Sequence, residues 1–233
     1  REERGKPHAP RSHRETLLVL ALIYAMQGRA EESRATAEEG IAIGKQLASP
    51  FVTAVALARL GHAQQVCGDL RAAIQCYEEA VALGEQLMVR RTRAEAMWGM
   101  TRAQGFSGDL RAAQRAAAEA LQVTQSAGDA WLAALIQIAL GSSWVFARHY
   151  RDALPVLSDA LAAMRSCGDK VGQTAARLWL ALAHWQLNQR DRAMTQLDEA
   201  LLLAQATQAD YLFTTRTLLG MQDARAMVPL LLQ

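Results

Sequence analysis

The six residues GDLRAA occur twice in this chain, at residues 68–73 and again at residues 108–113. A fixed period of this length is the signature of folds built from stacked units. Rows of forty residues that begin at Arg11 align in register through most of the chain. One column of these rows holds bulky apolar residues and another holds small ones: Leu20, Leu60, Met100, Leu140 and Leu180; Ser33, Ala73, Ala113, Ala153 and Ala193. The chain is therefore built on a forty-residue unit.

Each forty-residue row divides into two helical patterns. In the second row these are FVTAVALARLGHAQQVC at 51–67 and LRAAIQCYEEAVALGEQL at 70–87, which have the length and apolar spacing of helices. We expect first helices to end at Gly28, Gly68, Gly108 and Asn188, because glycine, and after it asparagine, takes the left-handed conformation at low cost. Asp69 and Asp109 then follow as N-caps of the second helices. The sequence predicts five helical hairpins.

The spacing of large and small residues within a row resembles the tetratricopeptide repeat family. The residues that carry the resemblance in rows two and five are Leu60, Gly61, Gln64, Ala73, Tyr77 and Ala80, and Leu180, Ala181, His184, Ala193, Leu197 and Ala200. The unit is longer than the usual length of about 34 residues, and is similar to repeats of kinesin light chains and of large bacterial regulators related to the maltotriose-responsive transcription activator. The resemblance implies an all-α fold, a right-handed α-solenoid of five helix–turn–helix repeats.

The rows also predict how the chain is organised. Residues 1–11 are expected to be a flexible linker, and residues 210–233 a partial repeat or a capping segment. Gly220 falls where leucine is expected in that last stretch, and Pro229 would interrupt a long helix. The five repeats are predicted at residues 12–50, 51–90, 91–130, 131–170 and 171–209. Because the sequence starts without methionine and ends on VPLLLQ, we expect it to be a piece of a longer protein.

Composition argues against several classes of function. A net charge of +2 is too small to indicate a nucleic-acid surface, and the apolar run at 17–26 is too short to span a bilayer. The three cysteines form no CxxC pair and indicate reduced thiols. The histidines lack metal-ligand spacing, and no nucleophile motif occurs. We expect a cytoplasmic, non-enzymatic protein without cofactor or metal, which contacts neither nucleic acid nor membrane; its oligomeric state stays open.

The two helices of each row differ in charge, and this difference predicts a binding face. Second helices carry acidic residues such as Glu78 and Glu79, whereas residues 131–147, a first helix, carry no charged residue. The resemblance implies that first helices line the concave surface of the superhelix, and apolar surfaces with aromatic residues are typical of binding sites. The groove positions that it implies include His62, Gln65, Glu95, Trp98, Arg102, Leu135, Ile138, Ser142, Val145 and Trp185.

The predicted groove is polar in the middle and apolar in its later half, which suits a peptide, an amphipathic helix, a partner domain or a small ligand. Structural alternatives stay open: Trp98 and Trp185 as core residues, and Glu95 and Arg102 as a solvated or inter-helix pair. Our first hypothesis is a recognition module, the sensor or interaction region of a larger bacterial regulatory protein that acts in signal transduction and transcription regulation. The alternative is a stand-alone scaffold or adaptor that assembles proteins or self-associates through its apolar ends.

Overall fold

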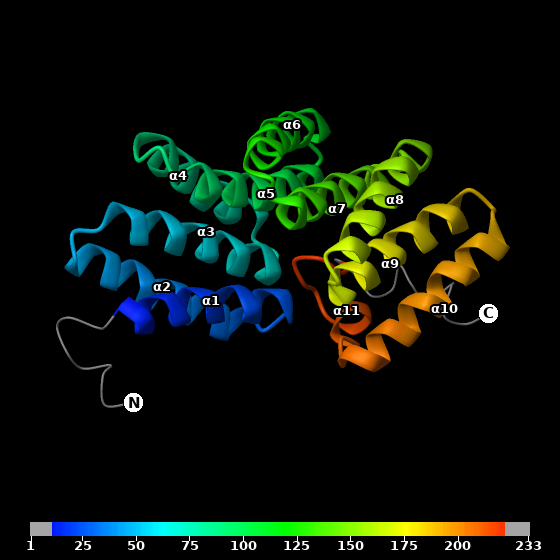
Figure 1. Ribbon diagram of the computed structural model, residues 1–233, viewed down its shortest axis with the longest axis horizontal. Coiled ribbons are helices and arrows are strands. Elements are labelled where there is room, and N and C mark those ends of the chain that lie inside the picture. The colour runs from blue at the N-terminus through cyan, green and yellow to red at the C-terminus, as the bar shows by residue number, and fades with distance from the viewer. Residues whose placement is uncertain (1–10, 222–233) are drawn as a thin grey trace.

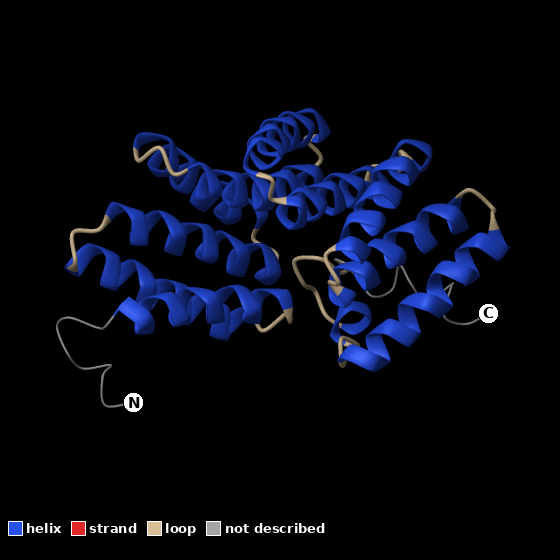
Figure 2. Cartoon of the chain, in the orientation of Figure 1, coloured by secondary structure: helices blue, strands red, loops and turns tan. Residues whose placement is uncertain are grey.

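The computed structural model describes residues 11–221, with side chains from Thr16 onward, and shows a chain of packed helices (Figures 1 and 2). The described residues form no strand, so the all-α prediction is confirmed. None of the helices within this range is both long and apolar enough to cross a membrane. The helices are α1 (Arg11–Met26), α2 (Ala30–Gln46), α3 (Pro50–Cys67), α4 (Leu70–Gln86), α5 (Arg90–Ser107), α6 (Leu110–Ala127), α7 (Ala130–Phe146), α8 (Tyr150–Ser166), α9 (Lys170–Gln186), α10 (Arg190–Thr207) and the one-turn α11 (Tyr211–Thr214). Residues 1–10 of the predicted linker 1–11 and residues 222–233 lie outside the described residues.

The turns between helices use the predicted residues. Gly68 ends α3 with φ of 96°, and Asn188 takes φ of 58° between α9 and α10. The Asp69 carboxylate accepts a 2.9 Å hydrogen bond from the backbone N–H of Ala72, and Asp109 caps α6 in the same way. These caps satisfy N–H groups that a helix start leaves without intrahelical partners. At these turns the helix boundaries therefore follow from local sequence signals.

The helices form two layers. Helices α1, α3, α5, α7 and α9 pack against one another in series, and the even-numbered helices pack on the outer side between them. We call the surface of the odd-numbered helices that faces away from the even-numbered ones the inner face. Consecutive helix pairs stacked in this way make an α-solenoid.

Small residues let the two layers approach each other. The Tyr77 ring of α4 lies against Gly61 of α3 and Gly99 of α5, and a methyl group added to Gly61 would lie 2.6 Å from the ring. Leu157 of α8 meets Gly141 of α7 in the same way. A bulky side chain of the outer layer thus fills the space that glycine leaves on the inner helix. The small column of the second helices is fully buried in all five repeats: Ser33, Ala73, Ala113, Ala153 and Ala193.

The chain leaves the repeat pattern after α10. Helix α11 starts where the next inner helix would start but ends after one turn, and residues 215–221 then cross the inner face towards the first helix pairs (red in Figure 1). Leu218 and Leu219 are buried there. A methyl group added to Gly28, in the turn after α1, would lie 2.8 Å from the carbonyl oxygen of Arg216. We call residues 211–221 the C-terminal segment.

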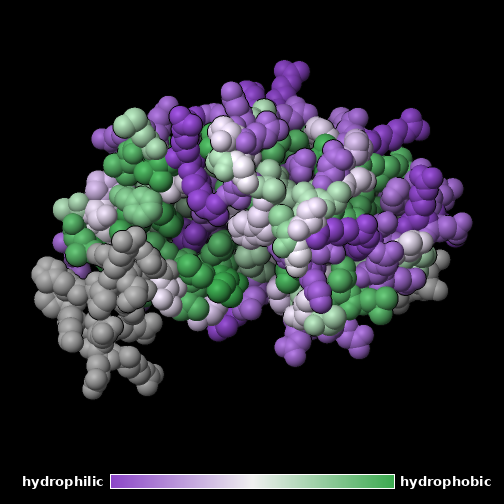
Figure 3. Space-filling model, viewed as in Figure 1, coloured by the Kyte–Doolittle hydropathy of each residue, from purple (hydrophilic) through white to green (hydrophobic). Residues whose placement is uncertain are grey.

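The first inner helix has an exposed apolar side. Val19 and Ile23 of α1 are 52% and 40% exposed, and hydrophobic residues gather over the N-terminal helices in the space-filling view (Figure 3). In α3, α5, α7 and α9, the residues one or more forty-residue periods after Val19 and after Ile23 are all buried. Because those positions pack within the stack in the later repeats, α1 presents the end of the stack to solvent.

Replacing Gly99 by Ala should destabilise the solenoid, although alanine favours a helix over glycine by about 1 kcal/mol. The added methyl group would lie 2.5 Å from Cε1 of Tyr77, and overpacking of this kind costs about 1–3 kcal/mol. We expect a lower midpoint of thermal unfolding, measured by circular dichroism. Gly84→Ala on α4 is the matched control, since the nearest atom to its methyl group is 3.3 Å away. Equal midpoints for both variants would contradict the packing of Tyr77 between the layers.

Candidate functional site

The predicted groove residues all lie on inner helices, and most of them are buried. Glu95 and Trp185 are half-buried. The C-terminal segment lies against one of the others, since the carbonyl of Gly220 accepts a hydrogen bond from Arg102, and Leu218, Leu219 and Met221 belong to the same apolar cluster as Trp98, Leu135 and Ile138. Trp98, whose ring was a candidate for groove exposure, is 2% exposed. The buried members are His62, Gln65, Trp98, Arg102, Leu135, Ile138, Ser142 and Val145.

Five polar side chains of α3, α4 and α5 form a buried network in the middle of the stack. The Arg59 guanidinium forms an ion pair with Glu95. The Tyr77 hydroxyl donates to Gln65 Oε1 at 3.2 Å and lies 2.7 Å from His62 Nδ1. His62 Nε2 lies 3.9 Å from Glu95 Oε1, which is too far for a hydrogen bond. The network ties two inner helices and one outer helix together.

Burial and the ion pair set the charges of this polar network. Burial raises the pKa of Glu95, but the Arg59 guanidinium and the His62 ring lower it by more, so that the pKa falls from 4.5 to about 2. Burial lowers the pKa of His62, although Glu95 acts in the opposite direction. Burial also raises the pKa of Tyr77 well above its ordinary value. At neutral pH the network therefore holds one carboxylate, one guanidinium, a neutral imidazole and a neutral phenol.

Arg102 of α5 is buried without a carboxylate partner among the described residues. Its Nη1 donates to Ser142 Oγ at 2.9 Å, and its Nη2 donates to the carbonyl of Gly220. The guanidinium carbon lies 4.5 Å from the ring centre of Phe106 and 5.4 Å from that of Trp179. Burial lowers the pKa of Arg102 to about 9, so it stays charged at pH 7. Neutral oxygens and aromatic faces thus hold a buried cation.

Some polar atoms of this region have no hydrogen-bond partner within residues 11–221. They are His62 Nε2, Gln65 Nε2 and Arg102 Nε. Buried polar atoms usually have a partner, so each of these three is an exception. This region therefore keeps unused hydrogen-bonding capacity next to its apolar residues.

Sequence reasoning missed three residues of this region. Arg59 was detectable as a charge within a first helix, and Tyr77 as the bulky residue of the second helix. Trp179 donates from Nε1 to the carbonyl of Leu219 at 2.8 Å, a contact that no sequence pattern indicates. Of the alternatives for Glu95, the structure shows an inter-helix pair, with Arg59 rather than Arg102 as its partner.

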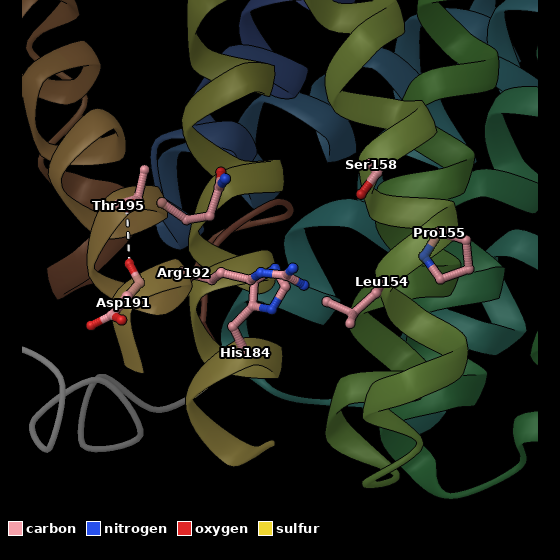
Figure 4. Close-up of a pocket in the computed structure, with 8 residues that line it drawn as sticks. Leu154, Pro155, Ser158, His184, Asp191, Arg192 and Thr195 are labelled. Carbon is pink, nitrogen blue, oxygen red and sulfur yellow. Dashed lines mark hydrogen bonds between the residues drawn. The ribbon is translucent and has the colours of Figure 1, made fainter. Parts of the chain in front are cut away.

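A separate pocket of about 550 Å³ opens between α8, α9 and α10 (Figure 4). His184 Nδ1 lies 2.7 Å from Gln189 Oε1, and the Thr195 hydroxyl donates to the backbone carbonyl of Asp191 at 2.9 Å. No group of side chains in the described part of the chain could hold a metal ion. The pocket includes none of the predicted groove residues, and it is a crevice between helix pairs. Its lining residues are Leu154, Pro155, Ser158, His184, Asp191, Arg192, Thr195 and Gln196.

Comparison with known proteins places the fold. Residues 54–85 and 174–207 match the tetratricopeptide repeat model. A Podosopora anserina protein described as a kinesin light chain, with nearly identical TPR-like repeats, is similar with a TM-score of 0.58 and 17% identity over 85% of this chain and 97% of that one. A second structure of such repeats from that organism has a TM-score of 0.56 and 18% identity, over 88% of this chain and 99% of that one. BtubC (BKLC) from P. vanneervenii has a TM-score of 0.63 and 17% identity, over 83% of this chain and 80% of that one. A search of curated proteins finds no match.

The chain is therefore an α-solenoid of the tetratricopeptide repeat type, as the sequence predicted. Two of its helix pairs match the repeat directly, and the other pairs share the same two-layer packing. Because the identities are 17–18%, the similarity to kinesin light chain repeats and BtubC establishes the fold alone.

Glu95→Gln should destabilise the protein by about 3 kcal/mol at pH 7, because the buried Arg59 would lose its counter-charge. With the pKa of Glu95 lowered from 4.5 to about 2, the carboxylate stabilises the fold fully above about pH 5, and this contribution is lost as the pH falls towards 2. The difference in urea midpoint between wild type and variant should therefore shrink from pH 5 to pH 3. The control is Glu32→Gln, since Glu32 and its partner Arg29 are both about half-exposed, and exposed pairs contribute about 0–1 kcal/mol. A loss as large in the control would contradict the role given to the buried pair.

Proposed function

We propose that this chain is a protein-interaction module that binds a peptide, an amphipathic helix or a partner domain on its inner face. One observation carries the proposal: the inner face already holds polypeptide backbone, because Trp179 and Arg102 donate hydrogen bonds to the carbonyls of Leu219 and Gly220. Backbone contacts of this kind give affinity, and apolar pockets beside them give selectivity. The tetratricopeptide fold supports the same role.

We also propose that the module is the sensor or interaction region of a larger, cytoplasmic bacterial regulatory protein. The forty-residue unit supports this placement, since it resembles the repeats of such regulators. Binding on the inner face would change the curvature of the stack and so release an adjacent output domain. A reading frame that encodes a P-loop NTPase upstream or a helix–turn–helix downstream would support this placement, and a short stand-alone frame would contradict it.

Peptides selected from a random display library on this protein should bind to the inner face. Trp185 is the aromatic groove residue that stays partly exposed, and the Arg190 guanidinium lies 5.4 Å from its ring centre. Trp185→Ala should weaken peptide binding about ten-fold or more, as expected for an aromatic anchor, measured by calorimetry. Leu202→Ala on α10 is the control, since Leu202 is 67% exposed and should not affect binding. Equal affinity for both variants would place the binding surface elsewhere.

A second function, assembly of copies through the end of the stack, is favoured by the exposed side of α1. Burial of Val19 and Ile23 against another apolar surface would remove both from water. We expect the mass measured by light scattering to rise above the monomer with concentration in the wild type, and to stay monomeric in Ile23→Glu. A wild type that is monomeric at every concentration would rule this function out.

A further inference from the structure

The C-terminal segment lies on the inner face as a ligand would. Gln208 ends α10 with a positive φ of 55°, and the chain then turns onto the inner helices. Leu212, Leu218 and Met221 are at most 3% exposed. They share one apolar cluster with Trp98 of α5 and with residues of α7 and α9. The segment therefore covers the part of the inner face where the sequence predicted a groove.

Side chains of the inner helices hold this segment by its backbone. Trp179 Nε1 donates to the carbonyl of Leu219 at 2.8 Å, and Arg102 Nη2 donates to the carbonyl of Gly220. Such contacts recognise the backbone rather than particular side chains, so another segment with free carbonyls could take the same place. Selectivity comes from the apolar surface, which here takes the two adjacent leucines.

The segment is also folded on itself. The Thr217 hydroxyl oxygen accepts hydrogen bonds from the backbone N–H groups of Leu219 at 3.3 Å and Gly220 at 2.7 Å. A methyl group added to Gly220 would lie 2.7 Å from the carbonyl oxygen of Leu212. Because these contacts are internal, they need not break when the segment leaves the inner face as one unit.

The seated segment leaves part of the inner face unsatisfied. Arg102 Nε has no hydrogen-bond partner among the described residues even with the segment in place, although Arg102 Nη2 contacts the segment. An occupant that supplies an acceptor for this atom gains a hydrogen bond that the segment does not make. The occupant must gain enough binding free energy to compete with the segment, since a tethered segment acts at an effective concentration of the order of millimolar.

We propose that the C-terminal segment is an internal ligand of the inner face, which a partner peptide must displace. This inference rests on the proposed function. The displacing partner carries two adjacent bulky apolar residues, as Leu218 and Leu219 are here. The backbone carbonyl of the second of them faces Trp179, and that of the residue after it faces Arg102. Occupancy by the segment lowers the apparent affinity for that partner by the fraction of molecules whose inner face is free. The segment thereby sets a threshold of affinity or concentration for binding.

A labelled peptide with the sequence of residues 211–221, YLFTTRTLLGM, tests the proposal on the full chain. Leu218→Lys places a charge in a buried apolar site and should release the segment. Leu202→Lys is the control, a charge at an exposed position of α10. By fluorescence anisotropy, the peptide should bind Leu218→Lys at least about ten-fold more tightly than wild type or the control. Addition of Arg102→Met to Leu218→Lys should weaken this binding again.

Hydrogen exchange on the wild type gives a second, independent measurement. The amides of residues 217–221 should exchange at least about ten-fold faster than those in the middle of α5 and α9, since the segment opens without global unfolding. Equal exchange rates would overturn the proposal, because the segment would then be a permanent part of the core. The proposal would also be overturned if Leu218→Lys releases the segment but does not bind the labelled peptide more tightly than wild type. If the labelled peptide binds as expected but no library peptide does, the internal ligand stands and the proposed outside partner fails.

Discussion

The structure depends on small residues at the places where the inner and outer helices cross. Gly61 and Gly99 leave room for the Tyr77 ring between two inner helices, and the ring is long enough for its hydroxyl to reach His62 and Gln65. The close packing of the layers therefore also positions the buried polar network around Tyr77. A larger residue at either glycine would move the network as well as the helices.

The helices could be predicted because their signals are local. The pattern predicted helices over 51–67 and 70–87, and the structure has Pro50–Cys67 and Leu70–Gln86. Some turns carry no such signal: Ala48, Met88 and Arg148 take φ of 46°, 57° and 64° without being glycine. At those turns the repeat register, rather than the residue type, located the helix ends, since packing of the neighbouring pairs imposes the conformation.

The candidate site could be predicted only in part. The register placed His62, Gln65 and Glu95 on one face, and they do lie in one network with Arg59 and Tyr77. It could not predict what covers that face, because the contact between Arg102 and Gly220 joins residues 118 positions apart. The last stretch has no repeat pattern, so nothing in its sequence indicated where it would pack. The binding role of the groove residues remains a prediction.

The path of the last described residues changes the mechanics of the whole array. In an open solenoid each repeat touches only its neighbours, so the stack bends and stretches like a spring with free ends. Here Arg216 Nη1 donates to the carbonyl of Cys67 at 3.2 Å, and Thr215 packs against Gly28. These contacts link the first two helix pairs directly to the chain that follows the fifth pair, without passing through the pairs between them. While the contacts are in place they hold the distance between the two ends of the stack, and the stack can bend or stretch only when they open.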